Sequence, residues 1–198
     1  MLSYGLGDAG TGLAATQLGF YLFPFFTGPA GLPAVIAGSL LMVIKVWDAF
    51  NDPLIGWLSD HTNTRWGPRL PWMICGAPAL GITLAAMWWV PRGDTADRTT
   101  YYILMAVLLM TAYTSVNLPF AALSTELTEE TAIRTRLNAA RFTGSILAGL
   151  SGLIIAAKLL SAGDMGYLSM GKITGAIATT STLISCWGLA PFAKQARK

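Results

Sequence analysis

The sequence predicts an all-α, polytopic membrane protein with six transmembrane helices. Its 198 residues are 54% hydrophobic and only 12% charged, and their mean hydropathy is +0.54, whereas an ordinary soluble domain carries about 25% charged residues. The chain divides into six apolar segments, each close to the roughly 20 residues that cross a bilayer as a helix. None of them shows the polar–apolar alternation of a membrane β-strand. Composition and segment length therefore predict a helical bundle inside a membrane.

The first three segments lie at about 3–27, 32–59 and 70–91. The first ends at the run TGPAGLP, in which glycine and proline favour a turn. The second ends at the basic run NTRWGPRLP, and the third ends at the polar run PRGDTADR. Each separator combines helix breakers with polar residues, so each is expected to be a loop at the membrane surface.

The last three segments lie at about 99–123, 137–162 and 171–192. The charged run ELTEETAIRTR separates the fourth from the fifth, and the short run SAGDMG separates the fifth from the sixth. Six helices with five loops place both ends of the chain on the same side of the membrane.

Basic residues predict which side that is. A cytoplasmic N-terminus places eight basic residues inside and four outside, which is the bias that cytoplasmic loops show. The inside set is Arg65, Arg69, Arg134, Arg136, Arg141, Lys194, Arg197 and Lys198, and the outside set is Arg92, Arg98, Lys158 and Lys172. We therefore expect both termini in the cytoplasm. The net charge of +3 is too small, and its basic residues too scattered, to predict a nucleic-acid partner.

The second segment carries charge within its membrane-spanning length. Lys45, Asp48 and Asp52 are spaced three and four residues apart, so they share one face of a helix. Charges inside the bilayer normally face a bundle interior or a water-filled cavity. This face is the strongest functional signal in the sequence.

Polar residues of three other segments fall at a similar depth. Thr114 and Asn117 lie in the inner half of the fourth segment, and Asp8 and Arg141 lie near the inner ends of the first and fifth. All of them would reach a level between the midplane and the cytoplasm. We therefore expect one aqueous cavity shared by four helices.

The residue types predict a monovalent cation site. A hard cation such as Na⁺ prefers oxygen ligands, which Asp48 and Asp52 supply together with an amide or hydroxyl and with carbonyls freed by Pro53 and Pro119. Without the cation the two carboxylates repel each other, and one can take up a proton instead. Sodium and proton coupling both remain open. The alternative is a structural network in which Lys45 neutralises an aspartate.

Three stretches carry a family resemblance: YGLGDAG, then KVWDAFNDPLIGWLSD followed by RWGPRLPW, then NLPFAAL followed by RTRLNAAR. They resemble the glycoside–pentoside–hexuronide:cation symporter family, the melibiose permease-like branch of the major facilitator superfamily. The resemblance implies that residues 1–198 form the N-terminal six-helix domain of a two-part fold. It also implies that the C-terminal half is missing after KQARK, unless a second copy takes its place.

The resemblance implies roles for individual residues. Asp48 and Asp52 match the positions that hold the coupling cation, and Asn51 and Thr114 match positions that assist them. Arg141 matches an arginine that serves sugar binding.

Lys45 matches a basic residue of the same charged network, and we add Asp8 and Asn117 to the expected solute-binding set. The two aspartates that grip the sugar in melibiose permease fall at Gly12 and Asn117 here. The resemblance therefore implies a sugar or glycoside without indicating melibiose.

The loop after the second segment resembles the gating motif of the superfamily. Its matching residues are Gly56, Asp60, Arg65, Gly67 and Arg69, and the resemblance implies that they latch the cytoplasmic side. A basic turn that only marks the cytoplasmic side is the alternative.

We therefore expect cation-coupled symport, driven by Na⁺ or H⁺, of a sugar or glycoside across a bilayer, in the bacterial inner membrane. No catalytic motif predicts an enzyme, and no cofactor other than the coupling ion is expected. A carrier for a non-sugar amphipathic solute and a non-transporting membrane subunit remain the alternatives.

Overall fold

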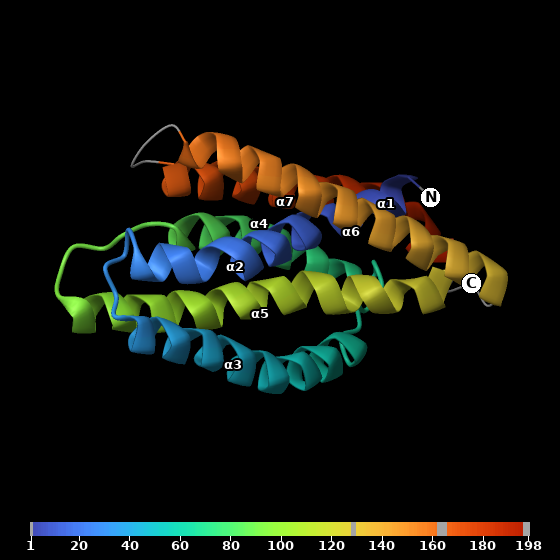
Figure 1. Cartoon of the computed structure of the whole chain (residues 1–198). Helices are drawn as coiled ribbons and strands as arrows, with labels where there is room; N and C mark the ends of the chain where they lie inside the picture. The colour runs from blue at the N-terminus through green and yellow to red at the C-terminus, as the bar shows by residue number, and fades with distance from the viewer. Residues whose placement is uncertain (1, 128–129, 162–165, 196–198) are drawn as a thin grey trace.

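The computed structural model describes residues 2–127, 130–161 and 166–195, and all regular secondary structure in these residues is helical. Long helices run side by side in a bundle (Figure 1). The prediction of an all-α membrane bundle is confirmed. The helices are α1 (Leu2–Gly7), α2 (Ala9–Thr27), α3 (Ala34–Asp60), α4 (Leu70–Met87), α5 (Thr95–Leu127), α6 (Thr131–Leu160) and α7 (Gly166–Gln195).

The first predicted segment is interrupted at Asp8, which separates α1 from α2. The backbone of Asp8 remains near the helical region, with φ −95° and ψ −2°, and its carbonyl accepts a hydrogen bond from the Gly12 amide at 2.9 Å. The interruption is therefore local, and α1 and α2 together form the first of six long helices.

Three helices, α5, α6 and α7, are longer than their apolar segments. α5 begins at Thr95 because the Asp94 side chain accepts a hydrogen bond from the Asp97 amide at 2.9 Å, as a capping residue does. α6 begins at Thr131, so its first turns include charged residues that hydropathy had assigned to the preceding loop. Among the described residues, four helical stretches are long and apolar enough to cross a membrane: Ala34–Asp60, Leu70–Met87, Thr95–Ser124 and Thr131–Leu160.

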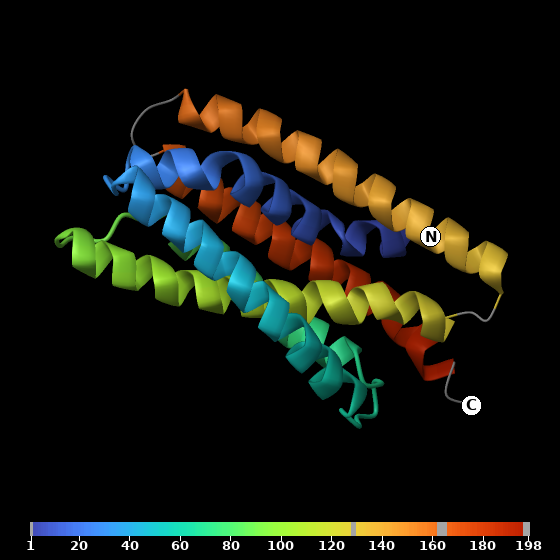
Figure 2. The ribbon, with the colours of Figure 1, turned by 60° about the horizontal axis from the view of Figure 1, so that its bottom comes forward.

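Glycines set the closest contacts between helices. A Cβ at Gly81 of α4 would lie 2.6 Å from the carbonyl oxygen of Gly175 in α7, and a Cβ at Gly144 of α6 would collide with the carbonyl oxygen of Gly5 in α1. Small residues allow such approach where helices pack within a membrane. α2 also packs against α6 and α7, whereas α3 packs mainly on α5, at the bottom edge of the bundle in Figure 1 and in front of α5 in Figure 2.

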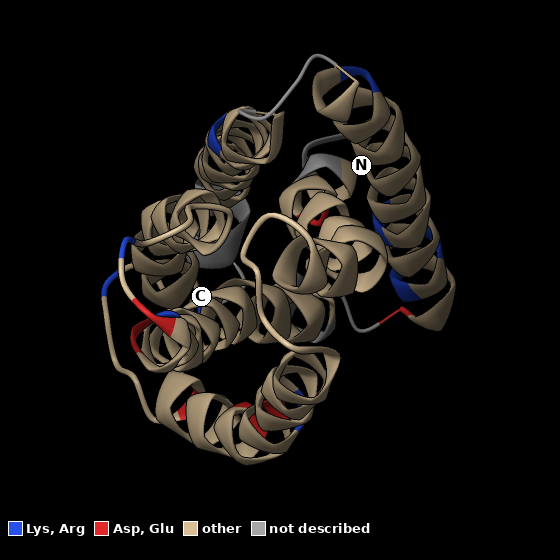
Figure 3. Ribbon diagram, turned by 60° about the vertical axis from the view of Figure 1, so that its left-hand side comes forward, with Lys and Arg blue, Asp and Glu red and all other residues tan. Residues whose placement is uncertain are grey.

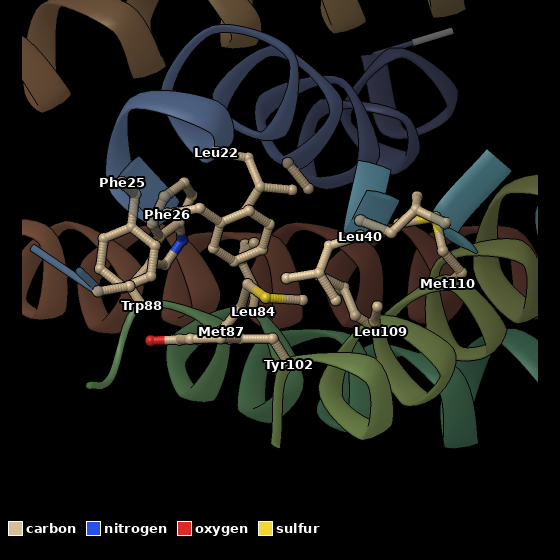
Figure 4. Close-up of a cluster of buried hydrophobic side chains, with 14 of the residues drawn as sticks. Leu22, Phe25, Phe26, Leu40, Leu84, Met87, Trp88, Tyr102, Leu109 and Met110 are labelled. Atoms are coloured by element: carbon tan, nitrogen blue, oxygen red, sulfur yellow. The ribbon is translucent and has the colours of Figure 1, made fainter. Parts of the chain in front are cut away.

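The predicted outer end of the bundle is closed by aromatic packing. The Phe25 ring lies 5.2 Å from that of Trp88 and 5.9 Å from that of Tyr102, within the cluster shown in Figure 4. The Tyr102 hydroxyl donates a hydrogen bond to the Trp89 carbonyl at 3.1 Å. Arg98 donates another to the Ala30 carbonyl at 2.9 Å. Side chains from the start of α5 thus bind carbonyls that follow the ends of α2 and α4, where helical partners are absent.

Replacing Arg98 with Met should therefore destabilise the bundle, because the Ala30 carbonyl loses its donor. A buried unpaired carbonyl costs about 1–3 kcal/mol of stability. In a chain of this size that loss lowers the Tm by roughly 2–10 °C. The apparent Tm in detergent, measured at one scan rate, checks this. Arg92→Met removes an exposed cation close by and serves as control; equal melting of the two variants would contradict the role of Arg98.

Candidate cation and solute site

Two polar cavities adjoin on one face of the bundle. The first has a volume of about 290 Å³ and is lined by α3, α5 and α6, and the second has a volume of about 280 Å³ and is lined by α2, α5 and α6 together with Asp8. Tyr113, Asn117 and Arg141 line both of them. In Figure 3, where the helices are seen nearly end-on, acidic and basic residues occur within helices as well as in loops.

α5 provides the wall that the two cavities share. Tyr113 and Asn117 are four residues apart and therefore lie one above the other on the same helical face. The Asn117 side-chain amide donates a hydrogen bond to the Tyr113 hydroxyl at 3.2 Å. Thr114 lies beside them and faces α3.

Arg141 connects three parts of the chain. Its Nε donates to the Asp8 carboxylate at 3.0 Å, and its Nη2 donates to the Asn117 side-chain oxygen at 2.9 Å. The other carboxylate oxygen of Asp8 accepts from the Thr11 hydroxyl at 2.7 Å. Asp8 is only 5% exposed. An ion pair removed from water is tolerated when hydrogen bonds satisfy the remaining polar groups, and this one has such partners on both sides.

The Arg141 guanidinium also lies near two aromatic rings. It is 5.7 Å from the centre of the Phe120 ring and 5.6 Å from that of Phe142. A guanidinium within about 6 Å of an aromatic face is attracted to it. These contacts hold the Arg141 head group at the edge of both cavities.

The carboxylates of α3 face the first cavity. The Thr114 hydroxyl donates to the Asp52 carboxylate at 2.9 Å, and Asp48 lies one helical turn earlier on the same cavity wall. Thr114 is buried, whereas Asp52 is exposed to the cavity. Two carboxylates and one hydroxyl thus offer oxygen ligands to a small cation.

Asn51 and Lys45 are arranged differently from these residues. Asn51 is 1% exposed and donates to the Met110 carbonyl at 3.3 Å, so it binds α3 to α5 and does not line the polar cavities. Lys45 lines a third, mostly apolar cavity beside Asp48. The described residues include no ion pair between Lys45 and either aspartate of α3. Their roles as cation and solute ligands stay predictions.

Four of the five predicted gating residues lie at the end of α3 or in the turn that leads to α4. Arg69 forms an ion pair with Asp60 at 3.3 Å, and the Arg65 guanidinium lies 5.1 Å from the Trp66 ring centre. Gly67 has a φ of +95°, which favours glycine.

Gly56 lies on α3, where an added Cβ would come within 3.2 Å of Leu118 on α5. A side chain at this position would press against α5. Gly56 thus permits close packing of α3 and α5 directly before the turn.

Tyr113 is the residue that the sequence analysis missed. It lines all three cavities, and its hydroxyl accepts the hydrogen bond from Asn117. Its position four residues before Asn117 was the signal that could have identified it, because that spacing places both on one face.

The whole chain is similar to known membrane transporters. A family model described as MFS/sugar transport protein matches residues 3–198. A Synechocystis protein named as an uncharacterized symporter, sll1374, is 42% identical over 195 residues, which cover 93% of this chain and 36% of that protein.

Two further relatives carry more specific names. The putative glycoside/cation symporter YagG of Escherichia coli is 34% identical, over 88% of this chain and 39% of its own length. An isoprimeverose transporter of Lactiplantibacillus pentosus is 30% identical, over 73% of this chain and 30% of its own length. The chain spans about a third of the length of these curated relatives.

Substitutions of Asp8 and Arg141 should be coupled far more strongly than those of Asp60 and Arg69, whose carboxylate is exposed. Asp8→Leu and Arg141→Met, made singly, each leave one buried charge unpaired, at a cost of about 3–5 kcal/mol. The double variant removes both charges and should melt at a higher temperature than either single variant. Apparent Tm values of the three proteins in detergent check this.

The matched control is the same cycle on Asp60 and Arg69, where the Asp60 side chain is 60% exposed. The Arg69 side chain is only 14% exposed, so the control differs from the Asp8–Arg141 pair in the exposure of its carboxylate. Water at that carboxylate screens the attraction, so the coupling in the control should be the smaller of the two. Additive effects of the Asp8 and Arg141 substitutions would show that the buried pair does not act as a unit.

Proposed function

The chain belongs to the MFS/sugar transport protein family, and on this basis we propose that it supplies the N-terminal six helices of a cation-coupled sugar or glycoside symporter. Its relatives are symporters and transporters by name, and its helices are apolar over membrane-spanning lengths. The chain is therefore an integral membrane transporter protein and not an enzyme. The activity of the complete transporter, its solute and its ion are parts of the proposal.

One observation carries the proposal: α5 contacts the Asp52 carboxylate of α3 and the Asp8–Arg141 pair within one helical turn. Thr114 bonds to Asp52, and Asn117, three residues later, bonds to Arg141. A change at either cavity therefore acts on the same segment of α5. An element that contacts both sites gives each ligand a means of changing the affinity for the other.

The cation would occupy the cavity beside Asp48 and Asp52, with Thr114 as the neutral ligand. Asn51 would act by fixing α3 on α5 or by turning its carbonyl oxygen, which is buried without a partner, toward the ion. Cation binding removes the repulsion between the two carboxylates. Na⁺ and H⁺ both fit this chemistry, because either one neutralises a carboxylate.

The solute would bind beside Asp8, Asn117 and Arg141. Lys45 would lie at the end of the site that adjoins the third, mostly apolar cavity. These side chains offer charged and neutral hydrogen-bonding groups at short spacing, as sugar hydroxyls require. Relatives named as a glycoside/cation symporter and as an isoprimeverose transporter support a sugar or glycoside. A non-sugar amphipathic solute is the second candidate, and a non-transporting subunit is the third.

A second half would cover the face on which the cavities lie. Carriers of this architecture bind solute between two halves that rock against each other. The second half would come from the same gene or from a second copy of the chain; we call the resulting protein the assembled transporter. In it, the loop of Gly56, Asp60, Arg65, Gly67 and Arg69 would latch the cytoplasmic side. We propose the bacterial inner membrane, with both termini cytoplasmic.

Asp52→Asn in the assembled transporter should abolish uptake that depends on a cation gradient, because the site loses a negative charge. Downhill solute exchange should persist, since Asp8, Asn117 and Arg141 are unchanged. Uptake of a panel of labelled methyl glycosides into vesicles measures the gradient-dependent uptake when a sodium or proton gradient is present and the downhill exchange when it is absent. Unchanged gradient dependence in this variant would refute the cation assignment.

Thr114 provides a matched pair of variants for the same site. Thr114→Val keeps the shape but loses the hydroxyl that orients the Asp52 carboxylate, and loss of such a partner of a cation ligand lowers cation affinity by about 10- to 100-fold. Thr114→Ser keeps the hydroxyl and should remain close to the parent. The cation concentration that gives half-maximal uptake checks both variants. Equal concentrations for Thr114→Val and Thr114→Ser would exclude Thr114 as a ligand.

A further inference from the structure

A third cavity, of about 380 Å³, adjoins the polar cavities and is lined mainly by apolar side chains of α2, α3 and α5. It includes Leu18, Gly19 and Leu22 of α2, Leu41 and Ile44 of α3, and Leu109 of α5. We call it the apolar cavity. It is larger than either polar cavity, and of the proposed cation and solute contacts only Lys45 and Asp48 line it.

The apolar cavity is continuous with the proposed binding site. Asp48 and Tyr113 line both it and the carboxylate cavity, and Ala15 and Tyr113 line both it and the cavity beside Asp8. A molecule held by Asn117 and Arg141 therefore has the apolar cavity directly past the Tyr113 ring. Lys45, at the same junction, can lay its aliphatic stem along the apolar wall.

The cavity exists because α2 presents small residues where it passes α3. A Cβ added at Gly19 would meet no heavy atom within 4 Å, and Ala15 also lines this wall. Its buried floor consists of Leu22, Ile44 and Leu109. Such a surface offers water few hydrogen-bonding partners, so an apolar group is the favoured occupant.

We propose that the transported solute is amphipathic: its polar head binds at Asn117 and Arg141, and an apolar substituent enters the apolar cavity. This inference rests on the proposed function and specifies its substrate class. An apolar cavity of about 150 Å³ holds a benzene ring, so this one holds an aromatic ring or an alkyl chain of about six carbons. The favoured substrates are therefore glycosides with an apolar aglycone, in preference to free sugars.

The test compares methyl, butyl, hexyl and decyl glycosides of glucose, xylose and galactose as inhibitors of uptake by the assembled transporter. Binding to protein-free vesicles is subtracted. Each buried methylene should tighten inhibition about two- to fourfold, up to about six carbons, and longer chains should give no further gain. The plateau separates a cavity of limited size from partition into lipid, where the gain continues with chain length.

Two glycine variants locate the effect. Gly19→Leu places a side chain in the apolar cavity, so it should remove the gain from methyl to hexyl while leaving methyl glycoside inhibition within twofold of the parent. Gly38→Leu is the matched control on α3. A Cβ at Gly38 would also meet no heavy atom within 4 Å, but Gly38 does not line the apolar cavity. It should behave like the parent throughout.

Each outcome decides the inference. Equal inhibition by methyl and hexyl glycosides, or a chain-length gain that survives Gly19→Leu, would overturn the amphipathic solute and leave the glycoside symporter in place. A gain without a plateau would also overturn it, since lipid or the second half would then supply the apolar surface. Absence of inhibition by every glycoside would overturn both this inference and the proposed sugar specificity.

Discussion

The structure depends on the need to pair charge inside a membrane. Asp8 lies at the junction of α1 and α2 and Arg141 lies within α6, and in a bilayer either charge would be costly alone. Their ion pair of 3.0 Å, completed by Thr11 and Asn117, joins the α1–α2 junction to α5 and α6. One buried network therefore both stabilises the bundle and brings polar groups to a cavity.

The rest of the bundle holds that network in place while leaving α3 less constrained. Glycine contacts fix α4 to α7 and α1 to α6, and aromatic packing closes the predicted outer end. α3 rests mainly on α5, to which Asn51 and Trp47 bind it through the Met110 carbonyl and the Thr111 hydroxyl. The helix that carries Asp48 and Asp52 is thus attached to the same helix that contacts Arg141.

α5 therefore serves three environments within a few residues. Thr114 faces the carboxylates, Asn117 faces the ion pair, and Tyr113 lies between the polar cavities and the apolar one. A tyrosine suits that position because its ring packs against apolar groups while its hydroxyl forms a hydrogen bond. In the proposed transporter, this one helix would contact the ion, the polar head group and the apolar substituent.

The sequence alone determined the six apolar segments, the common face of Lys45, Asp48 and Asp52, and the motifs of a cation symporter family. Those features follow from composition and from the period of a single helix. The tertiary structure decided that Asp8 pairs with Arg141, that Asn51 faces α5, and that Tyr113 joins three cavities. Periodicity places residues around one helix, but only packing between helices sets which face of each meets which neighbour.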